Sequence, residues 1–242
     1  MSDIAIDVKD LCINYKIIKR QSIKQSLFKW KKNKSELFPA VKNVTFSVKK
    51  GSILGIVGKN GSGKSTLLNT IAGIFSPDSG SVDLHGNSVS LLSIGVGFQR
   101  NLSGRDNIML CGMMLGFSKK KVMEKMDEII EFSELGSFID NPVRTYSSGM
   151  YSKLAFSITA ILETDIMLID EVLSVGDAKF RKKSYEKMKQ LISDADRTVI
   201  IVSHSNDTLE KLCDSLLWLH DGEIKMYGEV KEVLAAYNQY SA

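Results

Sequence analysis

The stretch Gly58-Lys59-Asn60-Gly61-Ser62-Gly63-Lys64-Ser65-Thr66 decides the fold of this chain, and it directly follows the apolar run Ile53–Val57. The apolar run predicts a buried strand. Leu67, Leu68 and Ile71 follow with helical spacing, so a helix is expected after the glycine-rich turn. A strand, a glycine-rich turn and a helix in this order are typical of a phosphate-binding loop.

Each part of this loop has a role in binding a chain of phosphates. Successive backbone N–H groups form an anion nest, and the positive end of the following helix adds to it. The glycines let the backbone approach the phosphates without a Cβ clash. Lys64 supplies a full charge, and Ser65 supplies a hydroxyl for Mg²⁺. The expected nucleotide-binding residues of the loop are Gly58, Asn60, Gly61, Ser62, Gly63, Lys64, Ser65 and Thr66.

The composition is that of one domain without a membrane span. The 242 residues are 43% hydrophobic, which suffices for one large core. No apolar run approaches the ~18–20 residues of a membrane helix, and the first residues do not resemble a signal peptide. The three cysteines, Cys12, Cys111 and Cys213, are scattered, which indicates reduced, buried thiols and no metal site.

The net charge of +4 comes from one local segment. Eight basic residues lie between positions 16 and 34 with no acidic residue among them, and the rest of the chain has an acidic excess. These residues are Lys16, Lys19, Arg20, Lys24, Lys29, Lys31, Lys32 and Lys34.

The hydrophobic pattern predicts an α/β core with a helical insert near residues 100–160. Alternating apolar residues predict half-exposed strands at 4–8 and 44–48, and a short strand is expected at 81–84. Further buried strands are predicted at 166–169 and 198–202, helices at 118–134, 150–162, 180–192 and 230–240, and a hairpin of 216–219 with 223–226.

Two carboxylates end the predicted strand 166–169. Asp170 at the end of a strand beside a phosphate-binding loop can hold Mg²⁺, usually through a water molecule. Glu171 can polarise the attacking water as a general base. The alternative for this pair is an acidic cap at a helix N-terminus, and the loop upstream argues against it.

Three further motifs lie at predicted element edges, and each is weak alone. Gln99 precedes the helical insert, Ser147 and Gly149 open a helix in the manner of an N-cap, and His204 follows the strand 198–202. A single histidine after a strand is more often structural than catalytic. The order in which the motifs occur is what gives them weight.

That order resembles the ATP-binding cassette (ABC) ATPase family along essentially the full length of the chain. Residues 58–66 resemble Walker A, Gln99 the Q-loop, 146–150 the Leu-Ser-Gly-Gly-Gln signature, 166–170 Walker B, 174–177 the D-loop and His204 the switch histidine. The resemblance implies a single ABC ATPase domain over residues 1–242. Its expected fold is a P-loop NTPase, RecA-like α/β core with an N-terminal antiparallel β subdomain and an inserted α-helical subdomain.

The resemblance also implies a head-to-tail homodimer with two ATP molecules at its interface. Ser147 and Gly149 of one copy would meet the γ-phosphate held by Walker A of the other, where the helix N-terminus offers free N–H groups. Asp177 would communicate across the dimer.

The implied catalytic roles follow from the same family pattern. Lys64 and His204 would stabilise charge on the γ-phosphate, and Glu171 would polarise water. Ser65 and Gln99 would hold Mg²⁺, with Asp170 behind them.

Three positions depart from the family pattern, and the adenine partner stays open. Ser148 and Met150 replace a glycine and the glutamine of the signature, and Gly176 stands where leucine is common in the D-loop. Tyr15 lies where the family places an aromatic residue that stacks on adenine, and Phe38 is its rival.

The motifs resemble those of bacterial exporters of lipid-linked polysaccharides, such as teichoic acid, O-antigen and capsule. The segments that carry this resemblance are the insertion 16–38, residues 93–108, 146–151 and 170–177. The resemblance implies a separate transmembrane permease subunit and a place at the cytoplasmic face of the bacterial plasma membrane. Another class of ABC exporter and a soluble, non-transport ABC ATPase are the alternatives.

Two segments are candidates for contact with the membrane system. The basic insertion, with Trp30 among its lysines, suits an anionic lipid or lipid-linked glycan headgroup, and a solvated basic loop is the alternative. Nucleic-acid binding is disfavoured because the rest of the chain is acidic. Phe98, Met109, Met113 and Met114 could line a groove for a short helix of the partner, or they could belong to the core.

Overall fold

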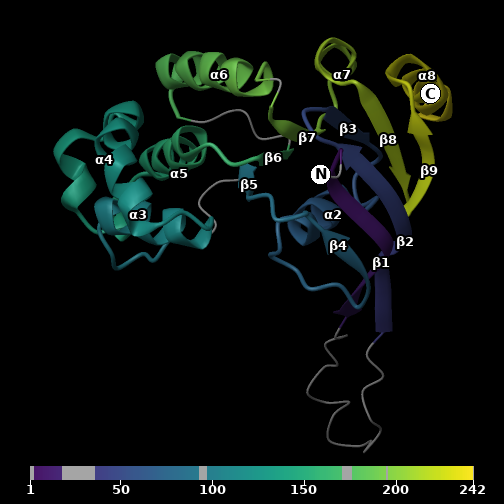
Figure 1. The fold of residues 1–242 in the computed structure, drawn as a ribbon, viewed down its shortest axis with the longest axis horizontal. Coiled ribbons are helices and arrows are strands. Elements are labelled where there is room, and N and C mark those ends of the chain that lie inside the picture. The colour runs from purple at the N-terminus through teal and green to yellow at the C-terminus, as the bar shows by residue number, and fades with distance from the viewer. Residues whose placement is uncertain (1–2, 18–35, 93–96, 171–175, 195, 242) are drawn as a thin grey trace, which may run out of the picture.

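The computed structural model describes residues 3–17, 36–92, 97–170, 176–194 and 196–241 (Figure 1). One lobe contains both sheets, and the other is made of helices (Figure 1). The expected α/β core with an antiparallel β subdomain and a helical insert is confirmed. Within the described residues, no helix has the length and apolar character needed to cross a membrane.

The larger sheet has six strands, and its centre is parallel. Its order is β5 (Val89–Leu92), β6 (Ile166–Asp170), β7 (Thr198–Val202), β3 (Ile53–Val57), β8 (Ser215–His220) and β9 (Glu223–Gly228). The first five strands are parallel, and β9 is antiparallel to β8. All five residues of β7 are buried, as expected for an apolar strand in the middle of a parallel sheet.

The smaller sheet is antiparallel, in the order β2 (Glu36–Lys49), β1 (Ile4–Ile17) and β4 (Ser79–Asp83). Its apolar face packs with the larger sheet and with helix α2 (Lys64–Ile71) in one core. Strands β1 and β2 are longer than predicted. Their pairing continues to Lys16 and Leu37, inside the segment expected to be an insertion. The remainder of the basic insertion, residues 18–35, lies outside the described residues.

The helical lobe has its own apolar core. Helix α3 (Gly104–Met114) and helix α4 (Lys119–Ser133) pack with helix α5 (Ser148–Leu162), with two short 3₁₀ turns at Gly136–Asp140 and Val143–Thr145 between α4 and α5. The prediction of a helical insert near 100–160 is confirmed. Helix α5 joins the lobes, since Phe156 and Ala160 pack instead in a core with helix α6 (Ala178–Ile192).

The C-terminal part completes the α/β lobe. Helices α7 (Asn206–Leu212) and α8 (Val230–Ser241) pack on β8. The predicted hairpin is confirmed, and its turn residues Asp221 and Gly222 have φ values of 47° and 83°, as a type I′ turn requires. Strand β5 and helix α7 are not predicted by the sequence pattern, because each is too short to show a clear period.

Candidate functional site

The phosphate-binding loop runs from the end of β3 at Val57 to the start of α2 at Lys64. Gly61 and Gly63 have φ values of 82° and 102°, which side-chain-bearing residues rarely adopt. A Cβ atom on Gly63 would lie 2.4 Å from the carbonyl oxygen of Ala40 in β2. The close approach of the two backbones therefore requires glycine at this position.

The side chain of Lys64 is hydrogen-bonded to the backbone of the phosphate-binding loop. The side chain is only 7% exposed, and its Nζ donates to the carbonyl oxygens of Gly58 at 2.8 Å and Lys59 at 3.1 Å. The ammonium group thus lies within the loop, beside the N-terminus of α2, where an anion is favoured.

Ser62 differs from the other predicted loop residues. Its side chain is buried, and its Oγ atom has no hydrogen-bond partner among the described residues. Its carbonyl oxygen accepts a hydrogen bond from the N–H of Gly222 at 3.0 Å. The N–H of Ser62 donates to the carbonyl oxygen of Lys59 at 3.1 Å. The β8–β9 turn therefore anchors the loop from behind, and both backbone groups of Ser62 hold the loop in shape.

A cavity of about 370 Å³ opens over the loop. It is lined by Tyr15, Phe38, Ala40, Asn60, Gly61, Gly63, Lys64, Ser65 and Thr66. None of these described lining residues is acidic, and Ser65 presents an exposed hydroxyl. The cavity thus combines a basic, donor-rich floor with an aromatic wall, which fits a nucleotide phosphate chain with its base.

Both candidate adenine partners belong to that wall. Tyr15 and Phe38 are directly paired across β1 and β2, so their side chains share one face of the sheet. The Tyr15 Oη atom is hydrogen-bonded to Thr66 Oγ1 at 3.1 Å, and its ring meets Phe75 edge-on at 6.3 Å between centroids. Tyr15 is fixed to the loop, whereas no such hydrogen bond can hold Phe38.

The carboxyl ends of the parallel strands bring two more predicted residues to the same edge. Asp170 ends β6 opposite Val202 of β7, and Val202 lies opposite Ile56 of β3. Asp170 is therefore two strand spacings, about 10 Å, from the strand that leads into the loop. His204 follows Val202 and is exposed at this edge. Glu171 lies outside the described residues.

Among the residues that the structure describes, no group of three or more His, Cys, Asp and Glu could hold a metal ion. A Mg²⁺ ion commonly takes one or two protein oxygens and completes its shell with phosphate and water. Ser65 and Asp170 fit that pattern, because one is exposed at the loop and the other ends a strand at the same edge.

The backbone of Gln99 is fixed by a residue of α3. Gln99 donates its N–H to Asn107 Oδ1 at 2.7 Å, and Asn107 Nδ2 donates back to the Gln99 carbonyl at 3.1 Å. Asn107 is fully buried and also donates to the carbonyl oxygens of Leu102 and Ser103. Asn107 therefore fixes the position of the Gln99 backbone at the edge of the helical lobe. The side chain of Gln99 is exposed.

The signature residues open α5 as predicted. Ser147 is the N-cap, and its Oγ atom accepts the N–H of Met150 at 3.2 Å. Ser147 and Ser148 are exposed, and neither they nor Gly149 line the nucleotide cavity of the same chain. Met150, which replaces the family glutamine, packs half-buried against the core of the helical lobe.

Asp177 is engaged within its own chain. Its side chain caps α6 by accepting the N–H of Phe180 at 3.0 Å, and it forms an ion pair with Lys153 of α5 at 2.7 Å. The Lys153 ammonium and the Phe180 N–H lower the pKa of Asp177 to about 2. The carboxylate is therefore ionised at neutral pH.

Known proteins are similar to this chain in sequence. Residues 41–174 match the ABC transporter family. The chain belongs to that family. It is 43% identical over 223 residues to the O-antigen export system ATP-binding protein RfbB of Myxococcus xanthus, which covers 90% of this chain and 51% of that protein. It is 39% identical over 239 residues to the teichoic acids export ATP-binding protein TagH of Staphylococcus haemolyticus, which covers 98% of this chain and 89% of that protein.

A solved cassette shows the same fold. A dimeric ATP-binding cassette in a post-hydrolysis state, bound to ADP and Pi, superposes with a TM-score of 0.69 over 93% of this chain and 98% of that chain, at 21% identity. The chain spans about half the length, or less, of several curated relatives it matches, among them the TagH proteins of Lactococcus lactis and Enterococcus faecalis.

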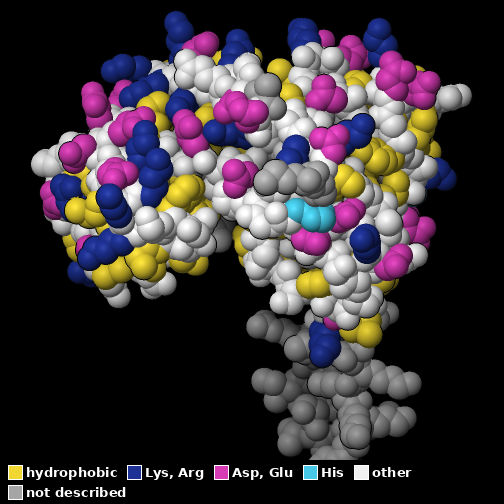
Figure 2. Space-filling view, in the orientation of Figure 1, with side chains coloured by type: hydrophobic (Ala, Val, Ile, Leu, Met, Phe, Trp, Pro, Cys, Tyr) yellow, Lys and Arg dark blue, Asp and Glu magenta, His cyan; other side chains and the backbone are white. Residues whose placement is uncertain are grey.

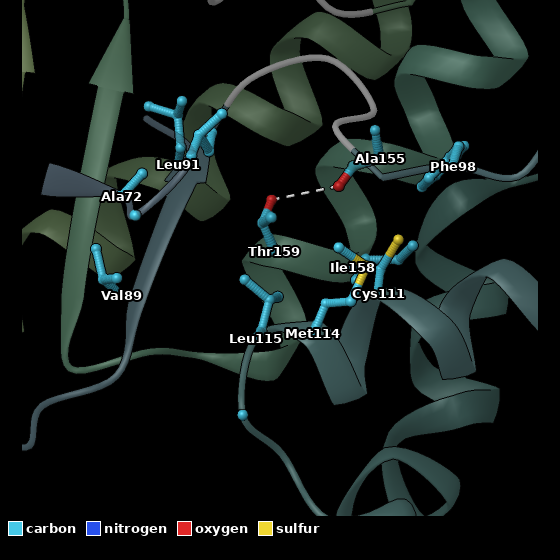
Figure 3. Close-up of a pocket in the computed structure, with 13 residues that line it drawn as sticks. Ala72, Val89, Leu91, Phe98, Cys111, Met114, Leu115, Ala155, Ile158 and Thr159 are labelled. Carbon is cyan, nitrogen blue, oxygen red and sulfur yellow. Dashed lines mark hydrogen bonds between the residues drawn. The ribbon is translucent and has the colours of Figure 1, made fainter. Parts of the chain in front are cut away.

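This ABC protein also has an apolar groove between its two lobes. The surface is hollowed there (Figure 2), and the groove has a volume of about 490 Å³. Figure 3 shows side chains from both lobes facing it, with Ala72, Val89 and Leu91 on one side and Phe98, Met114 and Ile158 on the other. The full lining is Ala72, Gly73, Ile74, Val89, Leu91, Phe98, Cys111, Met114, Leu115, Gly116, Ala155, Ile158 and Thr159.

The three methionines expected near this groove differ in exposure and in whether they line it. Met114 lines it and is 63% exposed, which fits the prediction of a partner-binding surface. Met113 is also exposed but does not line it. Met109 is partly buried in the core of the helical lobe, which fits the alternative. Phe98 lines the groove, and its ring packs at a tilt of 57° against Tyr151 of helix α5, with 4.8 Å between ring centroids.

Two residues of the site are not predicted by the sequence motifs. Asn107 of α3 holds the backbone of Gln99, which precedes that helix. Lys153 of α5 pairs with Asp177, which is distant in sequence and caps α6. A polar residue on the buried face of a helix is the available signal for Asn107. The sequence carries no such signal for Lys153, because a lysine in a helix is ordinary.

Proposed function

We propose that this chain is the ATP-hydrolysing subunit of a bacterial ABC exporter for lipid-linked polysaccharide, and that it powers a separate transmembrane subunit. The observation that carries the proposal is the split between two surfaces. The nucleotide cavity has a complete phosphate-binding floor, while the signature residues are exposed elsewhere in the same chain.

This split supports a homodimer in which each copy completes the other's site. The free N–H groups at the start of α5 and the positive end of its dipole favour an anion, and the cavity in the same chain does not use them. A two-fold pair satisfies both surfaces at once. ATP would then hold the copies together, and its hydrolysis would release them.

The residues of one site take distinct roles in this proposal. Lys64 and His204 stabilise charge on the γ-phosphate, and Glu171 polarises the attacking water. Ser65, Gln99 and Asp170 hold Mg²⁺, which neutralises developing phosphate charge when bound. Asp177 lies at the turn that communicates between the two copies.

The apolar groove between the lobes is the proposed seat of a short helix from the transmembrane subunit. Its lining comes from both lobes and includes Met114, a side chain that adapts to a partner. The basic insertion would contact anionic headgroups at the cytoplasmic face of the plasma membrane. Most of that insertion lies outside the described residues.

The substrate class is supported by the relatives. Proteins named for teichoic acid export and for O-antigen export both match this chain over nearly their whole length, at 89% and 85% coverage of the relative. We therefore propose a polysaccharide of either type. An ABC ATPase of another exporter class is the alternative.

Two substitutions test the enzymatic part. Glu171→Gln should retain ATP binding and ATP-dependent dimerisation and lose most turnover, while Lys64→Ala should lose nucleotide affinity. Calorimetric titration with ATP and a phosphate-release assay measure both. Unchanged turnover in Glu171→Gln would remove that residue from its role.

Two further substitutions test the partner. Met114→Glu places a charge in the groove, and Met123→Glu does the same at an exposed methionine of α4 outside it. Only Met114→Glu should reduce co-purification with the transmembrane subunit. In liposomes that contain both subunits, lipid-linked teichoic acid or O-antigen should stimulate ATP hydrolysis, and stimulation by neither would contradict the proposed substrate class.

A further inference from the structure

Lys153 occupies an unusual position on the signature helix. Its side chain is only 14% exposed, and its Nζ lies 2.7 Å from Asp177 Oδ2 and 3.7 Å from Glu134 Oε2. The same ammonium lies 5.1 Å from the ring centroid of Phe180 in α6. Lys153 therefore joins the signature helix to the turn that precedes α6.

The glycine of that turn makes the contact possible. Gly176 has a φ of 69°, and a Cβ atom there would lie 3.0 Å from Cε and 3.1 Å from Cγ of Lys153. The alkyl chain of Lys153 thus passes across the bare backbone of Gly176 to reach Asp177. The glycine in place of the leucine common in the family is favoured by this positive φ, which residues with a side chain rarely adopt.

The ion pair joins two segments that the proposed dimer brings to the partner copy, the start of α5 and the turn before α6. Lys153 is about 8 Å along α5 from its first residue, Ser148. Asp177 caps α6 in the turn that follows the Walker B strand along the chain. A change in the position of one end of this pair is passed to the other, because Lys153 Nζ contacts Asp177 Oδ2 directly at 2.7 Å. The Lys153 side chain is largely buried, and the Asp177 side chain is 60% exposed.

We propose that Lys153 is a positioning residue, which ties the Gly176–Asp177 turn to the signature helix so that both meet the partner copy as one rigid unit. This inference rests on the proposed function, since it assigns the signature helix to the dimer interface. Lys153 itself contacts no nucleotide in this proposal.

The competing explanation is that the pair only holds α5 and α6 together. The chain offers a matched control for that explanation. Lys187 of α6 pairs with Glu163 at the other end of α5, at 3.1 Å, and is 18% exposed. A purely structural ion pair should behave alike at both ends, whereas a positioning pair should matter only at the signature end.

The experiment uses the full chain with Glu171→Gln, so that ATP-bound dimers accumulate. Lys153→Met, Lys153→Arg, Asp177→Asn and Lys187→Met are added singly, and Lys153→Met is combined with Asp177→Asn. Asparagine keeps the N-cap of α6 and removes the charge. Dimerisation is measured by sedimentation with ATP, nucleotide affinity by titration of the monomer, and stability by thermal unfolding.

Lys153→Met should weaken ATP-dependent dimerisation about tenfold, a middle value for residues coupled by direct contact. Its nucleotide affinity should be unchanged, and its melting temperature should fall no more than that of Lys187→Met. Arginine should restore much of the loss, and the double variant should be no weaker than the worse single variant.

Equal dimerisation of Lys153→Met and Lys187→Met would overturn the inference alone. Strictly additive losses in the double variant would also overturn it, because they would show that the two residues act separately. A failure of the Glu171→Gln parent to dimerise with ATP would instead overturn the proposed dimer, and this inference with it. If Lys153→Met does not fold, the Lys153→Arg and Asp177→Asn variants decide the same question.

Discussion

Replacement of Asn107 by alanine tests how the Q-loop is attached to the helical lobe. The Asn107 side chain is fully buried, accepts one hydrogen bond from the Gln99 N–H at 2.7 Å, and donates to three carbonyl oxygens. Alanine removes the acceptor and the donors together. The Gln99 N–H then loses its partner at a part-buried position.

The magnitude follows from these bonds. A buried donor left without a partner costs about 1–3 kcal/mol, and each further hydrogen bond lost costs about 1 kcal/mol. Because the three carbonyls share only two N–H hydrogens, two further bonds are counted, and the sum is about 3–5 kcal/mol. That is a large part of the ~5–15 kcal/mol that stabilises a typical domain.

The assay is urea unfolding, with the exposed pair of Asn206 and Asn238 as control. Asn206→Ala removes one hydrogen bond of 3.2 Å at the surface and should cost less than about 0.5 kcal/mol. Because Asn107 does not line the nucleotide cavity, Asn107→Ala should bind ATP normally at low temperature and hydrolyse it more slowly. The reasoning is refuted if the two alanine variants unfold at the same urea concentration.

Three other predictions concern the cavity and the core. Gly63→Ala should abolish ATP binding in a titration, since its Cβ would lie 2.4 Å from the Ala40 carbonyl; near-normal affinity would contradict this. Tyr15→Ala should weaken ATP binding more than Phe38→Ala, by about 1–3 kcal/mol for a stacked base; the reverse order would assign adenine to Phe38. Burial raises the pKa of Cys111 from 9.0 to about 11. The thiol thus contributes stability that is fully present below pH 9 and is lost as the pH rises through 11, and Cys111→Ala should show a smaller loss of unfolding free energy over that range.

Much of this fold could be predicted because its signals are local. Three strands of the larger sheet are recognisable as buried from their apolar residues alone. They are Ile53–Val57, Ile166–Asp170 and Thr198–Val202. The phosphate-binding loop is equally local, since its conformation depends on glycines within six residues of one another. The type I′ turn at Asp221 and Gly222 belongs to the same class.

What could not be predicted depends on contacts between distant segments. Asn107 is informative only once α3 is known to pack under the Q-loop, and Lys153 only once α6 lies beside α5. The full length of β1 and β2 could not be predicted either. Lys16, which pairs with Leu37, lies in the basic segment that the sequence pattern assigns to an insertion. The choice between Tyr15 and Phe38 as adenine partner stays a prediction, with the hydrogen bond of Tyr15 to Thr66 in its favour.

The central claim is that Walker A of one copy and the signature of another form one site. Two variants in the Glu171→Gln background test it most directly: Lys64→Ala, which disables Walker A, and Ser147→Arg, which blocks the exposed signature helix. Neither variant alone should trap ATP in a dimer. A mixture should trap it, because Lys64 of one variant then faces Ser147 of the other, and no trapping in the mixture, or trapping by Ser147→Arg alone, would contradict the account.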